Sequence, residues 1–428
     1  MTTSPPLTAS AFQLTEGLDD WRVLGAGPSA FFSTGTHLDG ARLAALIAEL
    51  VEDRDLPDID VRATGVRVRL LPEDRLSEHE VDLARAISVA AESLGLTADP
   101  SRLQSLQIAI DAMDSDPLIP FWHRVLGHER RGETDLVDPL RRRPPLWFQS
   151  QDSPRPLRNR LHVDAVGPQS ISSDTVAALK AGAGQVADHG FYATVADADG
   201  NEADVLPLPA GSDRWEGSDT DDWRLVFSAM AAYRIADSHR AVEFIGDVAT
   251  LADEAELPLG IDVRPGWVVL DSGKDLWEIR DGYEELAGRV QQAARGRGLT
   301  ADESVCRFTQ IVIDAVDIPA VRAFWRSVLG YVDDPREGVT DIVDPAGLGM
   351  PIVFQNLEVS ETDRREQRNR LHLDLFVPDD QAAVQIKAGL DAGGRMTYDR
   401  EAPEWWTLAD PEGNEIDIAV VVGRDEAP

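Results

Sequence analysis

The sequence predicts an α+β protein built from two homologous halves. One motif occurs twice, as Asn-Arg-Leu-His-Val-Asp at residues 159–164 and as Asn-Arg-Leu-His-Leu-Asp at residues 369–374. Around both copies, segments with helical periodicity alternate with segments of strand periodicity, and several strands come in direct succession. At 428 residues the chain is too long for one hydrophobic core and suits two to four domains. We therefore expect a tandem duplication.

The repeat extends over almost the whole chain. Further shared stretches are Asp-Asp-Trp-Arg at 19–22 and 221–224, Gly-Leu-Thr-Ala-Asp at 95–99 and 298–302, and Phe-Trp with Val-Leu-Gly at 121–127 and 324–330. Their offset stays near roughly two hundred residues, so one unit of that length was copied. The expected halves are residues 1–210 and 211–428, joined by a Pro-Leu-Pro-Ala-Gly-Ser-Asp stretch that suits a polar linker.

The first part of each half reads as strand, helix, strand, strand, helix. A helix is expected over Leu38–Val51, and the alternation of Val66, Val68 and Leu70 predicts a strand. A second helix is expected over Val81–Leu94, with Ser77 and Glu80 as a capping box. The second half repeats this plan, with helices at 241–251 and 283–294 around a strand at 266–270.

The later part of each half contains more strands. Strands are expected at 106–112 and 308–315, and each is followed by a helix that ends at Gly127 or Gly330. In the first half the further expected elements are strands at 135–137, 146–149 and 160–166, a helix at 173–181, and strands at 191–195 and 201–206. This order is βαβββ followed by a second βαββ unit.

Composition excludes several classes of function. The chain has 41 Lys and Arg against 76 Asp and Glu, a formal charge of −35, which opposes binding to nucleic acid or anionic lipid. No apolar run has the length of a membrane span, and residues 1–10 lack the pattern of a signal peptide, so we expect a cytoplasmic protein. Cys306 is the single cysteine, which excludes an intramolecular disulfide.

The later part of each half resembles the glyoxalase-like, bleomycin-resistance-like domains of the vicinal oxygen chelate superfamily. The resemblance rests on Phe-Trp-x-x-Val-Leu-Gly, on Arg-Leu-His-x-Asp, and on the Asp-Pro-Glu-Gly-Asn-Glu stretch at 410–415, with a weaker copy at 197–202. It implies a small-molecule ligand and glyoxalase-like domains at 101–210 and 304–428.

The first part of each half resembles pterin-4a-carbinolamine dehydratase, which implies dehydratase-like domains at 1–100 and 211–303. The family's His-His-Pro motif reads Asp55-Leu56-Pro57 and Glu256-Leu257-Pro258 here. A carboxylate with an ordinary pKa is a poor general acid at neutral pH. We therefore expect that dehydratase activity is lost.

The glyoxalase-like resemblance also implies candidate metal ligands. Members that bind a metal carry one ligand on each of the first, fourth, fifth and eighth strands. Matching by motif gives Gln107, Gln149, His162 and Asp204 in the first copy, and Gln310, Gln355, His372 and Asp417 in the second. Such a set could hold Ni, Co, Mn, Fe or Zn, although less tightly than a His/Glu set. Asp164 and Asp374 are candidates for supporting the two histidines.

The remaining expectations concern the ligand. Strand alternation places Arg160 beside His162 and Arg370 beside His372, which would suit an anionic group. Alternation also sends the apolar neighbours of both histidines to the opposite, helix-covered layer. One of Trp405 and Trp406, and one of Phe191 and Tyr192, should face the ligand cleft.

Three functions remain open. The first is a metal-assisted lyase, isomerase or dioxygenase, with catalytic residues unknown. The second is a metal-free protein that binds or sequesters a small molecule. The third is a scaffold in which the dehydratase-like parts are assembly modules. We expect the two glyoxalase-like domains to pair within the chain about a pseudo-two-fold axis, and a homodimer is a further option.

Overall fold

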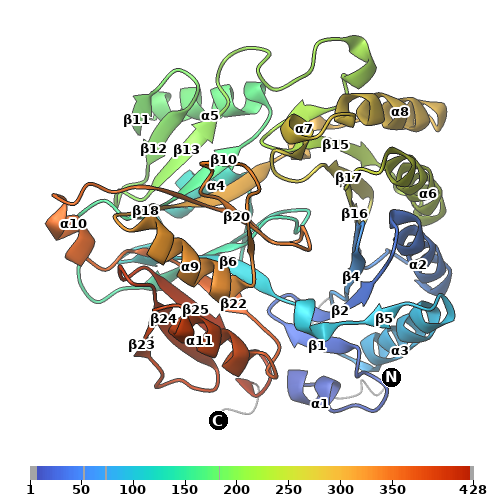
Figure 1. Cartoon of the computed structure of the whole chain (residues 1–428), viewed down its shortest axis with the longest axis horizontal. Helices are drawn as coiled ribbons and strands as arrows, with labels where there is room; N and C mark the ends of the chain where they lie inside the picture. Colours follow the sequence, from blue (N-terminus) through green and yellow to red (C-terminus); the bar gives the residue numbers. More distant parts are fainter. Residues whose placement is uncertain (1–6, 52–53, 73–74, 183, 425–428) are drawn as a thin grey trace. The chain divides into compact units, whose positions relative to one another are not determined.

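The computed structural model describes residues 7–51, 54–72, 75–182 and 184–424 (Figure 1). The chain forms two compact units, one from residues 1–104, 214–306 and 420–428, the other from residues 105–213 and 307–419. Each unit therefore takes one long segment from each half. The four domain boundaries stay a prediction, but the four segments associate in pairs within these units.

The first unit contains one antiparallel sheet that both halves share. Its strand order is β1-β2-β4-β3-β16-β17-β15-β14, and β5 pairs with β2. The first half supplies β1 (Trp21–Leu24), β2 (Gly27–Ser33), β3 (Asp58–Arg62), β4 (Gly65–Arg69) and β5 (Thr97–Ala98), and the second supplies β14 (Arg224–Leu225), β15 (Ala229–Arg234), β16 (Gly260–Arg264) and β17 (Trp267–Asp271). The halves join where β3 pairs with β16, with Asp60 opposite Asp262.

Helices pack along one side of this sheet and enclose the core (Figure 1). They are α1 (Ala9–Gln13), α2 (His37–Val51), α3 (Glu78–Ser93), α6 (Ser238–Ala255), α7 (Leu276–Ile279) and α8 (Tyr283–Gly296), with short 3-10 turns η1 (Pro100–Arg102), η2 (Ser218–Thr220) and η3 (Glu303–Val305). The predicted capping box is confirmed, because the Ser77 backbone N–H donates to Glu80 Oε2 at 2.8 Å. The cap starts α3 three residues before the periodicity predicted it.

The second unit contains two eight-stranded sheets with equivalent orders, β11-β12-β13-β10-β18-β21-β20-β19 and β23-β24-β25-β22-β6-β9-β8-β7. The first repeat supplies β6 (Ser105–Ala112), β7 (Glu129–Arg131), β8 (Asp135–Val137), β9 (Leu146–Ser150), β10 (Leu161–Val166), β11 (Gln185–Asp188), β12 (Ala193–Ala196) and β13 (Glu202–Leu206). The second supplies β18 (Phe308–Ala315), β19 (Val332–Asp333), β20 (Ile342–Val343), β21 (Ile352–Asn356), β22 (Leu371–Phe376), β23 (Arg395–Tyr398), β24 (Trp405–Ala409) and β25 (Glu415–Ala419).

Each sheet of the second unit combines four strands of one repeat with four of the other. The antiparallel pairs β10–β18 and β22–β6 form the two junctions. The repeats thus pair within the chain, as expected, but they do so by exchanging half of their strands. Strand periodicity cannot reveal this exchange, because it is the same whichever strand lies alongside.

The helices of the second unit are α4 (Ile119–Leu126), α5 (Gln169–Ala181), α9 (Ile318–Leu329), α10 (Thr362–Glu366) and α11 (Ala382–Asp391). The predicted helix ends are confirmed, since Gly127 and Gly330 adopt φ values of 64° and 66°. Leu161, Val163, Leu371 and Leu373 are buried, but so are the histidines and aspartates that alternate with them, so burial alone does not tell the two faces of these strands apart. Across the described ranges, no helix combines the length and hydropathy needed to cross a bilayer.

Candidate functional site

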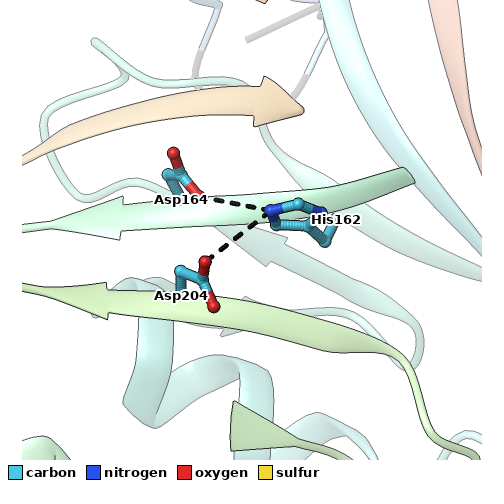
Figure 2. Close-up of side chains that lie close together, drawn as sticks. All are labelled: His162, Asp164 and Asp204. Atoms are coloured by element: carbon cyan, nitrogen blue, oxygen red, sulfur yellow. Dashed lines mark ion pairs between the residues drawn. The ribbon is translucent and has the colours of Figure 1, made fainter. Parts of the chain in front are cut away.

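His162 lies in a cluster of acidic side chains on one face of its sheet (Figure 2). His162 and Asp164 share this face because they are two residues apart on β10. Asp204 joins them because β13 pairs with β10 and places Asp204 opposite Asp164. The Nε2 atom of His162 lies 3.7 Å from Asp164 Oδ1 and 3.8 Å from Asp204 Oδ2.

His372 has the equivalent cluster in the other sheet. Its Nε2 atom lies 3.5 Å from Asp374 Oδ1, and Asp417 pairs with Asp374 across β22 and β25. In each cluster, the three potential ligand atoms lie within 4.8 Å of one another. Here the indole Nε1–H of Trp147 also donates to Asp374 Oδ2 at 2.7 Å. Each His–Asp–Asp group could hold a metal ion.

The glutamines reach these clusters from the opposite repeat. Gln310 pairs with Asp164 across β18 and β10, and its Nε2 donates to Asp164 Oδ2 at 2.7 Å. Gln107 pairs with Asp374 across β6 and β22, and Gln149 Nε2 lies 3.3 Å from His372 Nε2. The expected grouping within each repeat is therefore corrected, because the strand exchange puts Gln107 and Gln149 with His372 and Gln310 with His162.

Gln355, Asp164 and Asp374 also differ from what was expected of them. Gln355 Nε2 donates to Asp314 Oδ1 at 2.6 Å, and its side chain is exposed. Asp164 and Asp374 were expected to support the histidines, but they stand among the potential ligand atoms themselves. Their spacing of two residues from each histidine was the signal for this position.

The donor set fits a divalent cation. Gln310 Oε1 and Asp417 Oδ1 are buried, and neither atom accepts a hydrogen bond from any described residue. Burial raises the pKa of the Asp417 carboxyl, while His372 and a hydrogen bond from Thr407 lower it. In the other cluster, Thr194 Oγ1 donates to Asp204 Oδ1 at 2.6 Å. A buried carboxylate or amide oxygen without a donor is costly, and a cation would satisfy it.

A comparison with protein families identifies these segments. A family model described as a glyoxalase-like domain matches residues 107–206 and 310–419. The chain carries two glyoxalase-like domains. This confirms the resemblance of the later part of each half, whereas the dehydratase resemblance stays a prediction.

Several solved structures are distantly similar to this chain. Glyoxalase I from Zea mays is 9% identical over 74% of this chain and 93% of its own, with a TM-score of 0.39. A mutant of the same enzyme gives 9% identity over 74% and 95%, also with a TM-score of 0.39. A putative dioxygenase from Bacillus subtilis subsp. subtilis str. 168 is 10% identical over 74% and 86%, with a TM-score of 0.38. No curated protein matches the chain.

The two arginines that were expected to bind an anion instead hold the glyoxalase-like domains together. Arg160 is buried, and its Nε donates to Asn414 Oδ1 at 2.9 Å. Its terminal nitrogens donate to the carbonyl oxygens of Arg364, Arg365, Gln367 and Gly413. Arg370 makes the reciprocal contacts with Asn201, Gly200, Leu157 and Arg155. The contacts of Arg160 and Arg370 therefore link the two domains, and we call them the clasp.

The Gly-Asn loops that receive these arginines are anchored by the Phe-Trp motif. Trp122 Nε1 donates to Asp197 Oδ2 at 2.9 Å, and Trp325 Nε1 donates to Asp410 Oδ2 at 3.0 Å. The same aspartates accept from the backbone N–H groups of Asn201 and Asn414. The motifs that mark the glyoxalase-like domains in the sequence thus form one hydrogen-bonded framework around the sites.

Two aromatic pairs lie in or next to the strands β11 and β12 and the strands β23 and β24. Trp405 shares the face of Thr407 on β24, and it stacks on Tyr398 with ring centroids 6.2 Å apart. Tyr192 is placed likewise relative to Thr194, and it stacks on His189 at 4.6 Å. Trp406 lies on the other side, where it lines a shallow apolar hollow with α11.

Proposed function

We propose that each glyoxalase-like domain binds a divalent metal ion that holds a small oxygen-bearing molecule. The first ion would be held by His162, Asp164 and Asp204 with the Gln310 carbonyl, and the second by the residues His372, Asp374, Asp417 and Gln107. Two buried oxygen atoms support this proposal, the carboxylate Oδ1 of Asp417 and the amide Oε1 of Gln310. Neither accepts a hydrogen bond from a described residue.

The protein's own residues would position both the ion and the ligand. A divalent cation in this setting supplies a Lewis acid for a bidentate oxygen ligand. Thr194 restrains the Asp204 carboxylate, and Trp147 restrains the Asp374 carboxylate, so the donor atoms keep their orientation. The reaction class that suits this arrangement is a metal-assisted lyase, isomerase or dioxygenase.

Metal analysis of protein purified without a His-tag tests this proposal. After loading with Ni²⁺, Co²⁺, Mn²⁺, Fe²⁺ or Zn²⁺ and removal of excess ion, we expect two ions per chain. His162→Ala and His372→Ala should each remove one ion, and the double variant should remove both. His239→Ala is the control, because this histidine is exposed on α6 and far along the chain from either cluster. An unchanged metal content in the double variant would contradict the proposal.

A metal-free binding protein is the second candidate. In both sites a carboxylate already has a donor from the chain, since Gln310 donates to Asp164 and Trp147 to Asp374. Hydrogen bonds of this kind can satisfy a buried carboxylate without a cation. Protein that takes up no ion, yet binds a small molecule in a manner lost in the double histidine variant, would favour this candidate.

We propose further that the dehydratase-like segments have no dehydratase activity. Asp55 lines an open cavity of about 200 Å³ with His239 and Arg264. Glu256 ends α6 in the left-handed region, with φ of 55°. Because carboxylates stand where the resembled family has histidines, a pterin carbinolamine assay should show no turnover, and turnover that disappears in Asp55→Ala or Glu256→Ala would contradict this.

A further inference from the structure

The two metal-candidate clusters match each other, but their surroundings do not. Trp147 on β9 lies beside Ala109, which is itself opposite His372. At the equivalent place in the other sheet, Val353 on β21 lies beside Val312, which is opposite His162. At this pair of equivalent positions, an indole borders the His372 site and a valine borders the His162 site.

The loops after β6 and β18, the first strands of the two repeats, also differ. In the second repeat, α9 begins at Ile318, and the Glu412 carboxylate accepts from the backbone N–H of Val316 at 3.1 Å and of Asp317 at 2.6 Å. In the first repeat Asp199 stands at the position of Glu412, one methylene shorter. Its Oδ2 atom is buried and accepts no hydrogen bond from any described residue.

The first repeat consequently leaves a loop where the second has a helical turn. Helix α4 begins only at Ile119, so residues 113–117 stay non-helical. This loop borders a cleft of about 810 Å³, which is also lined by Arg130, Glu133, Thr134, Trp147 and Gln149. Two lining residues connect this cleft with the His372 site, because the Trp147 indole donates to Asp374 and Gln149 Nε2 lies 3.3 Å from His372 Nε2.

The lining of this cleft is acidic and partly apolar. Asp114, Asp116 and Glu133 contribute three carboxylates, and Met113 exposes 54% of its surface. Arg130 is the one cation among the lining residues, and it is engaged with the Glu133 carbonyl at 2.7 Å and with Asp116 at 3.9 Å. A cleft that combines an indole with several carboxylates suits an organic cation, because both the ring and the carboxylates attract positive charge.

We propose that the cleft beside the His372 site binds an organic cation with a planar apolar group, selected by Trp147, and that the His162 site has no such cleft ligand. The proposal rests on the proposed function in one respect: the residues Trp147 and Gln149, which line the cleft, also contact the residues proposed to hold the second ion. The size of the cleft suits a molecule larger than the ion itself. At the His162 site Val353 stands at the position of Trp147, so this cation would not be held there.

Titration calorimetry with trimethylphenylammonium tests the proposal, with benzoate and tetramethylammonium as probes that lack the positive charge or the ring. We expect one trimethylphenylammonium ion per chain and binding of both other probes weakened about tenfold or more. Trp147→Val, which copies the other site, should weaken binding about tenfold, and Trp147→Phe should retain most of it. Val353→Trp is the matched control and should leave the affinity unchanged.

Several results would overturn the proposal. These are no binding, two equal sites per chain, equal affinity for benzoate, or unchanged affinity in Trp147→Val. Metal content measured on the same samples separates this test from that of the proposed function. In the unaltered protein, two ions per chain without binding of the organic cation contradict this proposal alone, and binding of the organic cation without ions contradicts the proposed function alone. Trp147→Val and Trp147→Phe both lose the hydrogen bond to Asp374, so a difference between these two variants reports the aromatic ring and not the ion.

Discussion

At the scale of single residues, Arg160 illustrates how a motif can be shared for structural reasons. Its guanidinium is buried and satisfied by oxygen atoms of the opposite repeat. Removing it would leave those acceptors buried without a donor. We expect Arg160→Ala to lower the free energy of unfolding by about 3 kcal/mol, as measured by urea denaturation.

Arg158 provides the control for this variant. It lies two residues away, its side chain is 47% exposed, and it pairs only with Glu202 among the described ion pairs. Arg158→Ala should change the free energy of unfolding by no more than about 1 kcal/mol. Equal effects of the two substitutions would show that the clasp does not stabilise the unit.

His128 is a second residue with a measurable signature, because it titrates differently in the folded and unfolded protein. Burial, and then the nearby Arg143, lower the pKa of His128 to about 4. Its Nε2–H donates to the Pro144 carbonyl at 2.9 Å. As the pH falls below the unfolded pKa of about 6.5, only the unfolded state takes up a proton, so stability declines until the folded pKa is reached.

This difference predicts a loss of about 2 kcal/mol in the contribution of His128 between pH 7.5 and pH 5. His128→Gln keeps an N–H donor and cannot titrate. Urea denaturation of both proteins at the two pH values should show that the unaltered protein loses more stability on acidification than the variant. Parallel losses would mean that His128 does not carry the pH dependence.

At the scale of elements, local patterns predicted more than pairing did. The capping box at Ser77 and the left-handed glycines at 127 and 330 were readable, because each depends on residues within one turn. The pairing of β10 with β18 and of β22 with β6 was not readable, because each of these pairs joins strands of different repeats. Asp164 and Asp374 were placed on the correct face, yet their role depended on strands β13 and β25 beside them.

The β3–β16 junction makes a prediction at this scale. Arg62 pairs with Asp262 at 2.7 Å and Arg264 pairs with Asp60 at 2.5 Å, so two buried ion pairs cross the seam between the halves. Burial alone raises the pKa of Asp60, but Arg264 and three further arginines outweigh it and hold the pKa well below its usual range. Asp60 is therefore charged and stabilised by its partners.

Asp60→Asn should lower the free energy of unfolding by about 3 kcal/mol, because Arg264 would stay buried without its closest carboxylate. Asp39→Asn serves as the comparison, since the Asp39–Arg42 pair is largely exposed and should contribute less than about 1 kcal/mol. Chemical denaturation of both variants measures the difference. An Asp60 effect as small as that of Asp39 would contradict a stabilising seam.

At the scale of the whole molecule, both compact units depend on both halves of the chain. In a polypeptide of residues 1–210 alone, β3, β6 and β10 would lose the partners that they have in the full chain. Unpaired strand edges seek other strands. We expect the separate halves 1–210 and 211–428 to self-associate or aggregate, and to form a one-to-one complex when they are produced together.

Light scattering after size-exclusion chromatography measures this outcome. A folded, stable monomer of either half would contradict it. Metal content is a second measurement, because the ligand set proposed for each site includes a glutamine from the opposite repeat. Gln310 of the second repeat, for example, contacts Asp164 of the first. The mixed complex should therefore bind more metal ions than either half alone.

The exchange of strands between the repeats also limits how the gene can change. A substitution in β6 or β9 of the first repeat alters the site whose histidine the second repeat encodes. Deleting either repeat would remove four strands from the sheet that carries the histidine of the other repeat. A duplicated segment is usually free to diverge in sequence. Here that freedom is confined to positions such as 147 and 353, where the two sites differ and the strand pairing of both sheets is kept.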